Sequence, residues 1–527
     1  MAGRPRAPGA PLTEPGEGAF RRALEHHQAG RLEEAERSYR ESLAEEPGRL
    51  AALNNLGNVL RSAGRLAEAE TCFREALARD PEFIEALFNL GATLQSLGRQ
   101  SEASACFAQV LKFLLTTAYA LAKEHNFAAA ADCYARALEL QPDNAEVLVQ
   151  AGVVLDALHR QDEALQHLRK AVALQPEDAD AWFDLGIVLQ GRNEFAAAIE
   201  AFDAALRLAP ENGEAALAKA LSRLSAGDYA RGWPEYEVRH TGRFEYPRVV
   251  RPDLAMPMWR GEPLQGKRIL LVGEQGFGDQ VQFVRYAAVL AARGATVDVA
   301  VDRRLLRLLQ SAPGVRSALV AIQRDAFEYD YWSLLMSVPL YVGTRVENVP
   351  APTSYLKAPA AETDKWRERL RALPAGCLKV GLIWAGRDRR NVRTMQFSDL
   401  LPLAKVQGVG FVGMQFGETA AEPGAPAGFP HLQLGPEIGD FADHAALLAN
   451  LDLLVSADTA AVHVAAALGK PVWVLSPSNA DWRWMAERED SPWYPTVKLY
   501  RQQQRGDWAP VVARAARDLQ ALAARPA

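Results

Sequence analysis

The chain has 527 residues, of which 49% are apolar, and a formal charge of −6 at pH 7. This length predicts several domains with room for large cores, and the small charge argues against a general nucleic-acid binder, which usually has a strong basic excess. No stretch reaches the ~18 uninterrupted apolar residues of a membrane span, so we expect no transmembrane segment.

Residues 1–15 are rich in Pro and Gly and have no apolar core. They lack the apolar segment of a secretory signal, so we expect a disordered tail. The four cysteines show no C-x-x-C pair, and Cys72, Cys106 and Cys133 each precede an aromatic residue. We therefore expect them at packing positions in a reducing, cytoplasmic environment.

A period of 34 residues follows the tail, as between Gly57 and Gly91 or between Ala69 and Ala103. Small residues at this spacing suit two helices that cross closely. Prolines punctuate the turns, at Pro47, Pro81, Pro142, Pro176 and Pro210. The pattern resembles the tetratricopeptide repeat, a helix–turn–helix unit. The resemblance covers residues 16–240 and implies an all-α superhelix with a concave groove.

One interval departs from the period, because Phe107 and Tyr134 occupy equivalent places but are only 27 residues apart. Seven residues are missing there, including the turn proline. The sequence predicts either one longer helix or a distorted junction, which would change the curvature of the groove.

One position in the first helix of successive repeats is polar. Its residues are Asn55, Asn89, Thr116, Gln150 and Asp184. The resemblance places this position on the concave wall, where side chains with donors and acceptors can clamp an extended peptide. We expect an acceptor groove; the alternative is that Asn is simply common at this position of such repeats.

Residues 241–266 are rich in Pro and predict a linker, which is followed by two sets of alternating strand and helix patterns at 267–375 and 376–527. The first opens with a βαβ unit, "KRILLVGEQGFGDQVQFVRYAAVLAARGATVDVAV". The second contains "LLVSADTAAVHVAAALGKPVWVL". In open α/β sheets ligands bind at the carboxyl ends of strands, where Asp279 and Asp458 both fall.

Four segments together resemble bacterial tetratricopeptide-repeat glycosyltransferases: "WRGEPLQGK", "GEQGFGDQVQFVRY", "DTAAVHVAAALGKPVWVL" and "DWRWMAEREDSPWYP". The catalytic half of that family is similar to the ADP-heptose lipopolysaccharide heptosyltransferases of glycosyltransferase family 9. The resemblance spans about residues 255–520. It implies an α + α/β chain, with a repeat superhelix before a GT-B transferase of two Rossmann-like lobes. The lobe at 267–375 would take the acceptor and the lobe at 376–527 the nucleotide-sugar.

The loop "GEQGFGDQ" fits a dinucleotide fingerprint poorly, because Val281 stands where the third glycine belongs and Asp279 would repel a pyrophosphate. A carboxylate at a strand end can instead accept the proton of an attacking hydroxyl. The resemblance implies that Asp279 is this base and that Gly276, Gly278 and Gln280 belong to the acceptor loop. The alternative is a carboxylate that only suits the helix dipole.

A second helix begins after Asp458, and its free N–H groups favour an anion. The resemblance implies that Asp458, Thr459 and Ala460 hold the donor diphosphate and that His463 contacts the donor. Ala460 replaces the glycine of the heptosyltransferases. The alternatives are an ordinary cap by Thr459 and a packed histidine.

Further donor contacts are expected from Arg390 and Arg393 in the arginine-rich loop 387–393, which could neutralise the leaving group. This loop is shorter than in the family, which leaves open a catalytically inert copy, and it could also be a solvated basic loop. Gln415 and Glu418 could contact the ribose. Four aromatic residues follow; we expect packing for most and leave a stacking role open for the first: Trp482, Trp484, Trp493 and Tyr494.

Neither Asp178-Ala-Asp180 nor Glu328-Tyr-Asp330 has the setting of a metal-binding D-x-D pair, so we expect no metal and no cofactor. The favoured interpretation is an inverting glycosyltransferase of heptosyl type that acts on a protein or glycan acceptor recruited by the repeats. The alternatives are an O-GlcNAc-type protein transferase using UDP-GlcNAc, similar in layout only, and a repeat scaffold with an inactive transferase lobe.

Overall fold

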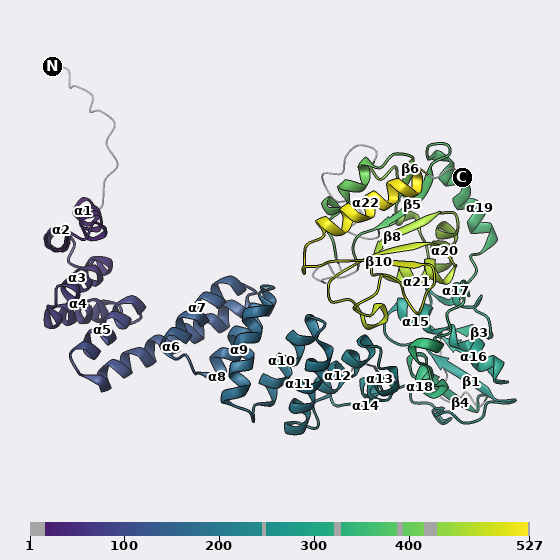
Figure 1. Cartoon of the computed structure of the whole chain (residues 1–527), viewed down its shortest axis with the longest axis horizontal. Helices are drawn as coiled ribbons and strands as arrows, with labels where there is room; N and C mark the ends of the chain where they lie inside the picture. The colour runs from purple at the N-terminus through teal and green to yellow at the C-terminus, as the bar shows by residue number, and fades with distance from the viewer. Residues whose placement is uncertain (1–15, 245–248, 321–327, 387–393, 416–428, 525–527) are drawn as a thin grey trace, which may run out of the picture. The chain divides into compact units, whose positions relative to one another are not determined.

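The computed structural model of the protein describes residues 16–244, 249–320, 328–386, 394–415 and 429–524. The chain forms two compact units, residues 1–176 and residues 177–527. The first unit is helical throughout its described part, and the second joins further helices to two parallel β-sheets (Figure 1).

The first unit is a stack of helix pairs. Its helices are α1 (Glu17–Gln28), α2 (Leu32–Glu45), α3 (Leu50–Ser62), α4 (Leu66–Arg79), α5 (Ile84–Ser96), α6 (Gln100–Lys123), α7 (Phe127–Leu140), α8 (Ala145–Ala157) and α9 (Gln161–Leu174). The small residues lie where the helices of a pair cross: a Cβ on Gly57 would be 2.6 Å from a ring carbon of Phe73. The predicted tetratricopeptide architecture is confirmed.

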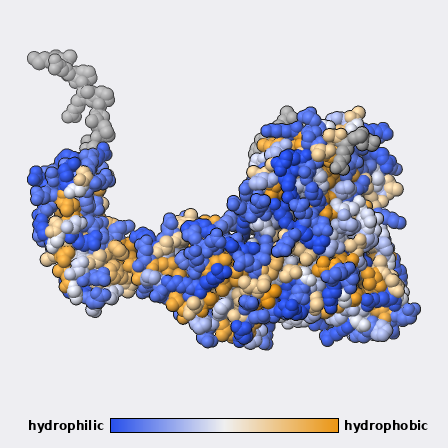
Figure 2. Space-filling view, in the orientation of Figure 1, coloured by the Kyte–Doolittle hydropathy of each residue, from blue (hydrophilic) through white to orange (hydrophobic). Residues whose placement is uncertain are grey.

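Helix α6 is the junction where seven residues are missing from the repeat. It runs for 24 residues without a turn, which confirms the longer helix. Among the described residues it is the one helix long and apolar enough to cross a membrane, judged by length and composition alone. That is weak evidence for a span, and the helix packs on α5 and α7 within the repeat stack. Apolar side chains also reach the surface along the repeats (Figure 2).

The second unit begins with repeat helices and continues into the α/β part. Its helices are α10 (Ala179–Gly191), α11 (Phe195–Leu208), α12 (Gly213–Ser225), α13 (Tyr229–Tyr236), α14 (Val238–Thr241), α15 (Phe277–Phe283), α16 (Tyr286–Ala292), α17 (Leu306–Leu309), α18 (Val338–Val342), α19 (Ala360–Arg369), α20 (Phe441–Ala449), α21 (Ala460–Ala467) and α22 (Ala509–Ala523). Short 3-10 turns are η1 (Leu335–Ser337), η2 (Val346–Asn348), η3 (Leu370–Ala372), η4 (Phe397–Lys405), η6 (Gly435–Glu437) and η7 (Trp482–Trp484).

Two sheets define two lobes. The first sheet has the order β3-β2-β1-β4 and the second the order β10-β9-β8-β5-β6-β7, and every pairing is parallel. The strands are β1 (Arg268–Val272), β2 (Thr296–Ala300), β3 (Val315–Leu319), β4 (Tyr331–Leu334), β5 (Leu378–Ile383), β6 (Val409–Gly413), β7 (Leu432–Gln433), β8 (Leu453–Ala457), β9 (Val472–Ser476) and β10 (Val497–Arg501). Strands β1 and β8 are central and almost wholly buried, as strands covered on both faces require. The predicted α/β part is confirmed.

The last repeat helices and both lobes share one apolar core. The indole N–H of Trp493 donates to the hydroxyl of Tyr229 at 3.0 Å, and the rings of Trp233 and Trp482 meet edge to face with centroids 5.3 Å apart. Residues 241–266, predicted as a linker, lie within this unit. The repeat helices of the second unit are therefore joined to the lobes through buried aromatic contacts, and the boundary between the two compact units falls inside the repeat array.

Candidate active site

The loop after β1 places Asp279 in the first turn of α15. Its Oδ2 accepts a hydrogen bond of 2.8 Å from the backbone N–H of Gly276, and its side chain is 16% exposed. Asp279 therefore binds a backbone N–H group at the start of α15, as a helix-end carboxylate does. This contact does not exclude a role as base, because a carboxylate has about four acceptor positions.

Arg483, in η7 of the other lobe, reaches Asp279. Its Nη2 donates to Asp279 Oδ1 at 2.5 Å, and its Nη1 lies 2.7 Å from Asp481 Oδ1. Its Nε donates to Gln282 Oε1 at 2.7 Å, and the guanidinium carbon lies 4.8 Å from the centre of the Trp482 ring. Sequence reasoning missed this residue. It lies in the segment "DWRWMAERED". The only feature that could have pointed to it is its place between Trp482 and Trp484.

The charges around Asp279 act in opposite directions. Burial raises the pKa of the Asp279 carboxyl, while the Arg483 charge lowers it; the Asp481 charge raises it again. The net effect is a raised pKa. Burial lowers the pKa of Arg483, but the charges of Asp481, Asp279 and Asp458 raise it. The raising effects outweigh burial, so the guanidinium stays charged. A carboxylate with raised proton affinity in a polar cluster is the kind of group that serves as a general base.

On the second sheet, β8 leads directly to Asp458 and the start of α21. Asp458 is buried and directly follows β8, at the predicted strand end. Thr459 occupies the N-cap position, but its side chain makes no capping hydrogen bond; its Oγ1 lies 3.2 Å from Ser456 Oγ instead. The alternative, an ordinary side-chain cap by Thr459, is therefore absent, because the neighbouring hydroxyl competes for the side chain; the diphosphate role of Thr459 stays a prediction. Ala460 is the first helical residue.

His463 lies one turn into α21 and is packed. Its Nδ1 is 2.9 Å from the Tyr494 hydroxyl, and its ring stacks on Trp484 with centroids 5.5 Å apart. A Cβ on Gly278 would lie 2.6 Å from His463 Cδ2. The loop of Asp279 and the first turn of α21 therefore touch, and only glycine permits this approach.

Two glutamines predicted in the site hydrogen-bond to backbone groups at the ends of strands. Gln280 Oε1 accepts from the backbone N–H of Asp302 at 3.2 Å, and its side chain is buried. Gln415 is also buried: its Oε1 accepts from the N–H groups of Trp384 and Ala385, and its Nε2 donates to the Ala385 carbonyl at 3.0 Å. These amides hold the ends of strands together; the acceptor-loop role of Gln280 and the ribose role of Gln415 stay predictions.

Arg390, Arg393 and Glu418 lie outside the described residues. The four aromatic residues of the C-terminal segment are all buried, including Trp482, for which a stacking role was left open. Trp482 packs against Trp233 and Trp493 in the shared core. Packing therefore accounts for the whole aromatic group.

The acidic pairs considered as metal ligands have other partners. Asp178 accepts from the N–H groups of Asp180 and Ala181 at the start of α10. Asp330 pairs with Lys267 and Glu328 with Arg268. In the part of the chain that the structure describes, no three His, Cys, Asp or Glu side chains gather in a way that could hold a metal. Metal independence stays a prediction.

The polar row, which is the set of residues predicted to line the acceptor groove, divides between the two units. Its members are Asn55, Asn89, Thr116, Gln150 and Asp184. In the first unit, Asn89 donates to Asn54 at 2.9 Å, Asn55 lies partly buried on α3, and Thr116 donates to its own helix backbone. Gln150 is exposed on α8. Asp184 belongs to the second unit, where burial raises its pKa to about 7, helped by the charges of Asp180 and Asp178. The acceptor groove stays a prediction.

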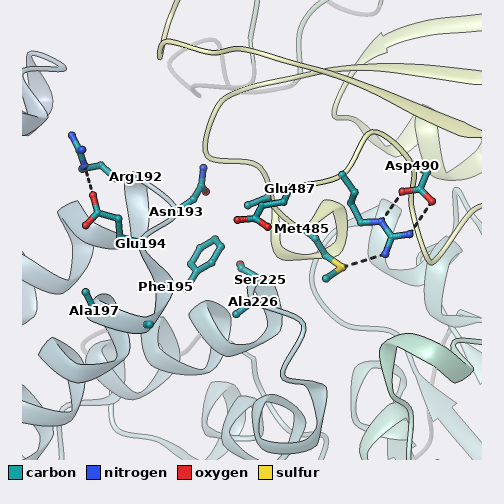
Figure 3. Close-up of a pocket in the computed structure, with 13 residues that line it drawn as sticks. Arg192, Asn193, Glu194, Phe195, Ala197, Ser225, Ala226, Met485, Glu487 and Asp490 are labelled. Atoms are coloured by element: carbon teal, nitrogen blue, oxygen red, sulfur yellow. Dashed lines mark hydrogen bonds and ion pairs between the residues drawn. The ribbon is translucent and has the colours of Figure 1, made fainter.

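The second unit also holds a cavity of about 980 Å³ (Figure 3). Its walls are the turn between α10 and α11, the end of α12, and the loop 485–490 that follows η7. Two ion pairs, Arg192 with Glu194 and Arg488 with Asp490, line it beside the apolar ring of Phe195. None of the predicted site residues lines this cavity.

Comparison with protein families gives matches in both parts of the chain. Residues 21–127 match the "Cilia and flagella-associated protein 70 middle TPR-like domain", residues 157–191 a "TPR repeat" and residues 179–212 a "Tetratricopeptide repeat". Residues 425–479 match "Glycosyltransferase family 9 (heptosyltransferase)". This last segment contains β8, α21 and β9, with Asp458, Thr459 and His463.

Protein FlbA of Caulobacter vibrioides is 30% identical over 337 residues, which are 58% of this chain and 55% of FlbA. The chain thus spans about half the length of that relative. Among solved structures, YrrB, "a TPR protein with an unusual peptide-binding site", is 23% identical with a TM-score of 0.21, covering 34% of this chain and 97% of its own. A tetratricopeptide repeat protein from Parabacteroides merdae is 20% identical with a TM-score of 0.22, covering 44% and 80%. The family matches support a glycosyltransferase-like protein that contains tetratricopeptide repeats.

Proposed function

We propose that the protein is an inverting, metal-independent glycosyltransferase of the GT-B type that moves a sugar from a nucleotide-sugar to a hydroxyl of a protein or glycan. The single observation that carries the proposal is the meeting of Asp279 from the first lobe with Arg483 and the first turn of α21 from the second. It supports the proposal because the carboxylate proposed as base lies beside the helix end proposed as anion site, near the carboxyl ends of central strands.

In the proposed reaction, Asp279 takes the proton of the acceptor hydroxyl while that oxygen attacks the anomeric carbon. A new carbon–oxygen bond forms, and the bond from the anomeric carbon to the phosphate oxygen breaks. Its electron pair leaves with the nucleoside diphosphate, and attack from the opposite face inverts the anomeric centre. Gly276 and Arg483 each use one acceptor position of the carboxylate, which leaves positions for the hydroxyl.

The donor diphosphate is proposed to lie at the N-terminus of α21. Because the Thr459 side chain is turned toward Ser456, the backbone N–H groups of Ala460 and Ala461 are the donors that this helix end offers. The family 9 match includes this segment, which supports the assignment. Arg390 and Arg393 are kept in the proposal as the charges that neutralise the leaving group.

The repeats are proposed to recruit the acceptor, as tetratricopeptide repeats generally mediate protein–protein interaction. Within the second unit, the cavity beside Phe195 is proposed as the place where part of the acceptor lies, because its loop 485–490 continues from Arg483 in η7. Phe195→Ala should then raise the KM for the acceptor and leave donor hydrolysis unchanged.

One observation favours a second candidate function. Asp279 is nearly buried and already holds two hydrogen bonds, which would also suit a closed, inactive lobe. The protein would then be a repeat scaffold that binds partners without catalysis.

A thermal-shift screen against ADP-, UDP- and GDP-sugars distinguishes the two functions. A ligand present at ~100 times its Kd adds ~2.7 kcal/mol to the free energy of unfolding. The transferase predicts a shift with one nucleotide and release of the nucleoside diphosphate when the acceptor is added. The scaffold predicts no shift with any of them.

A further inference from the structure

We propose that Arg483 is a positioning residue for Asp279: from the opposite lobe, it fixes the direction of the carboxylate and keeps it ready to accept the acceptor proton. The inference rests on the proposed function of Asp279 as base. It adds a residue from the C-terminal lobe to chemistry that the resemblance assigns to the N-terminal loop.

The geometry makes Arg483 a rigid support. Its planar guanidinium uses Nε, Nη1 and Nη2 on three different side chains, Gln282, Asp481 and Asp279. Its side chain is only 7% exposed and lies against the Trp482 ring. A donor held in this way cannot swing away without breaking several contacts, so it fixes the atom that it touches.

The carboxylate of Asp279 is therefore held from two sides. The N–H of Gly276, in its own lobe, binds Oδ2, and Arg483, in the other lobe, binds Oδ1. Two donors on different oxygens define the plane of the group. The remaining lone pairs then have a fixed direction, which a base needs for proton transfer.

The charged and titratable groups around Asp279 come from every element packed on it. They are Arg483 and Asp481 at η7, Glu274 after β1, Tyr236 of α13, Asp458 after β8, and His463 of α21. Glu274 is paired with Arg239 at 2.8 Å, which offsets its charge. Of this group, Arg483 is the cation in contact with Asp279, and Asp481 is an anion that opposes it.

The test is the pH dependence of kcat/KM, measured as release of nucleoside diphosphate from ADP-, UDP- or GDP-sugar with the full chain. Arg483→Met removes the cation, so the acid limb should move up by ~1–3 pH units. Asp481→Asn removes an opposing anion and leaves the pair with Asp279, so the limb should move down. Structural damage alone would lower the rate in both variants without moving the limbs in opposite directions.

Arg483→Lys is the conservative variant. It keeps the charge but not the fork that reaches three partners, so kcat should fall while the acid limb stays nearer to that of the parent than in Arg483→Met. The donor KM should change less than kcat in each variant, because Arg483 acts through Asp279. An acid limb that stays at the parental pH in Arg483→Met and Asp481→Asn would overturn the proposal.

Thermal unfolding as a function of pH gives a readout that needs no substrate. The folded pKa of Asp279 lies above its ordinary value of 3.8, so its ionisation lowers the free energy of unfolding as pH rises from that value to the folded pKa. Arg483→Met should extend this loss to higher pH, and the extension should vanish in an Asp279→Asn background. If Arg483→Met changes the pH dependence equally in both backgrounds, the two side chains are not coupled and the proposal fails. By contrast, Asp279→Asn with full turnover would refute the proposed function while leaving this coupling in place.

Discussion

The contacts inside the first unit and those inside the second differ greatly in sequence separation. In the first unit, each helix packs on its neighbours in the chain, as where Gly57 meets Phe73 within one repeat. In the second, Asp279 and Arg483 pair across 204 positions of sequence. A substitution in the repeats should therefore lower the stability of the helices around it. A substitution where the two lobes touch should instead lower the catalytic rate.

The largest expected effect is at Asp279. Asp279→Asn keeps the shape of the side chain but cannot accept the proton, so kcat should fall by ~10²–10⁴ with donor affinity nearly intact. Asp302→Asn is the matched control, because Asp302 follows the neighbouring strand β2 and its carboxylate is bound by Arg304, away from Asp279. The measurements are steady-state kinetics and the melting temperature. Full turnover in Asp279→Asn would show that this carboxylate only caps the helix.

The second effect concerns the contact between the lobes. In Gly278→Ala, the new Cβ would lie 2.6 Å from His463 Cδ2, so α15 must move away from α21. A shift of about 1 Å at a catalytic group can lower the rate ~10²-fold. Gly439→Ala is the control, since the nearest atom to a Cβ placed there is Asp443 Oδ2 at 3.8 Å, an ordinary contact distance. Equal kcat in Gly278→Ala and the parent would show that the close approach is not needed.

The third effect is structural and belongs to the repeats. Gly57→Ala forces a methyl against the buried ring of Phe73, and overpacking of this kind costs about 1–3 kcal/mol. Gly48→Ala is the control, because the nearest atom to its Cβ is the end of the Arg79 side chain at 3.4 Å. Chemical denaturation should show the loss for Gly57→Ala alone, with hydrolysis of the donor unchanged. Loss of hydrolysis would contradict the separation between the two regions.

A smaller effect is expected from the polar row. Asn55→Ala with Asn89→Ala should raise the KM for a large acceptor several-fold and spare donor hydrolysis, if this row binds the acceptor backbone. Removing Asn89 also deprives Asn54 of its partner, a loss of ~1 kcal/mol in stability. Gln95→Ala, on the exposed side of α5, is the control. An unchanged acceptor KM would assign the asparagines to repeat packing.

The smallest expected effect is that of chelation. Turnover should survive EDTA, because the proposal assigns the charge of the leaving group to arginines and the N-terminus of α21. The measurement is the rate with and without EDTA, followed by addition of Mn²⁺. Activity that is lost and then restored by Mn²⁺ would contradict metal independence.

The sequence by itself determined the repeat array, because its small residues recur at a fixed spacing wherever neighbouring helices must cross. It also allowed the long helix α6 to be anticipated from the missing turn, and it placed Asp279 and Asp458 at strand ends. These features follow from local periodicity and chain order.

Only the tertiary structure decided what these residues contact. A glutamine that follows a strand has the same sequence signature whether it meets a ligand or, like Gln280 in α15 and Gln415 after β6, a backbone amide at the end of a neighbouring strand. Thr459 is likewise followed by a helix whether it caps that helix or turns to Ser456. Arg483 reaches Asp279 because two separate lobes bring their loops together, and no local pattern encodes a pairing over so many residues.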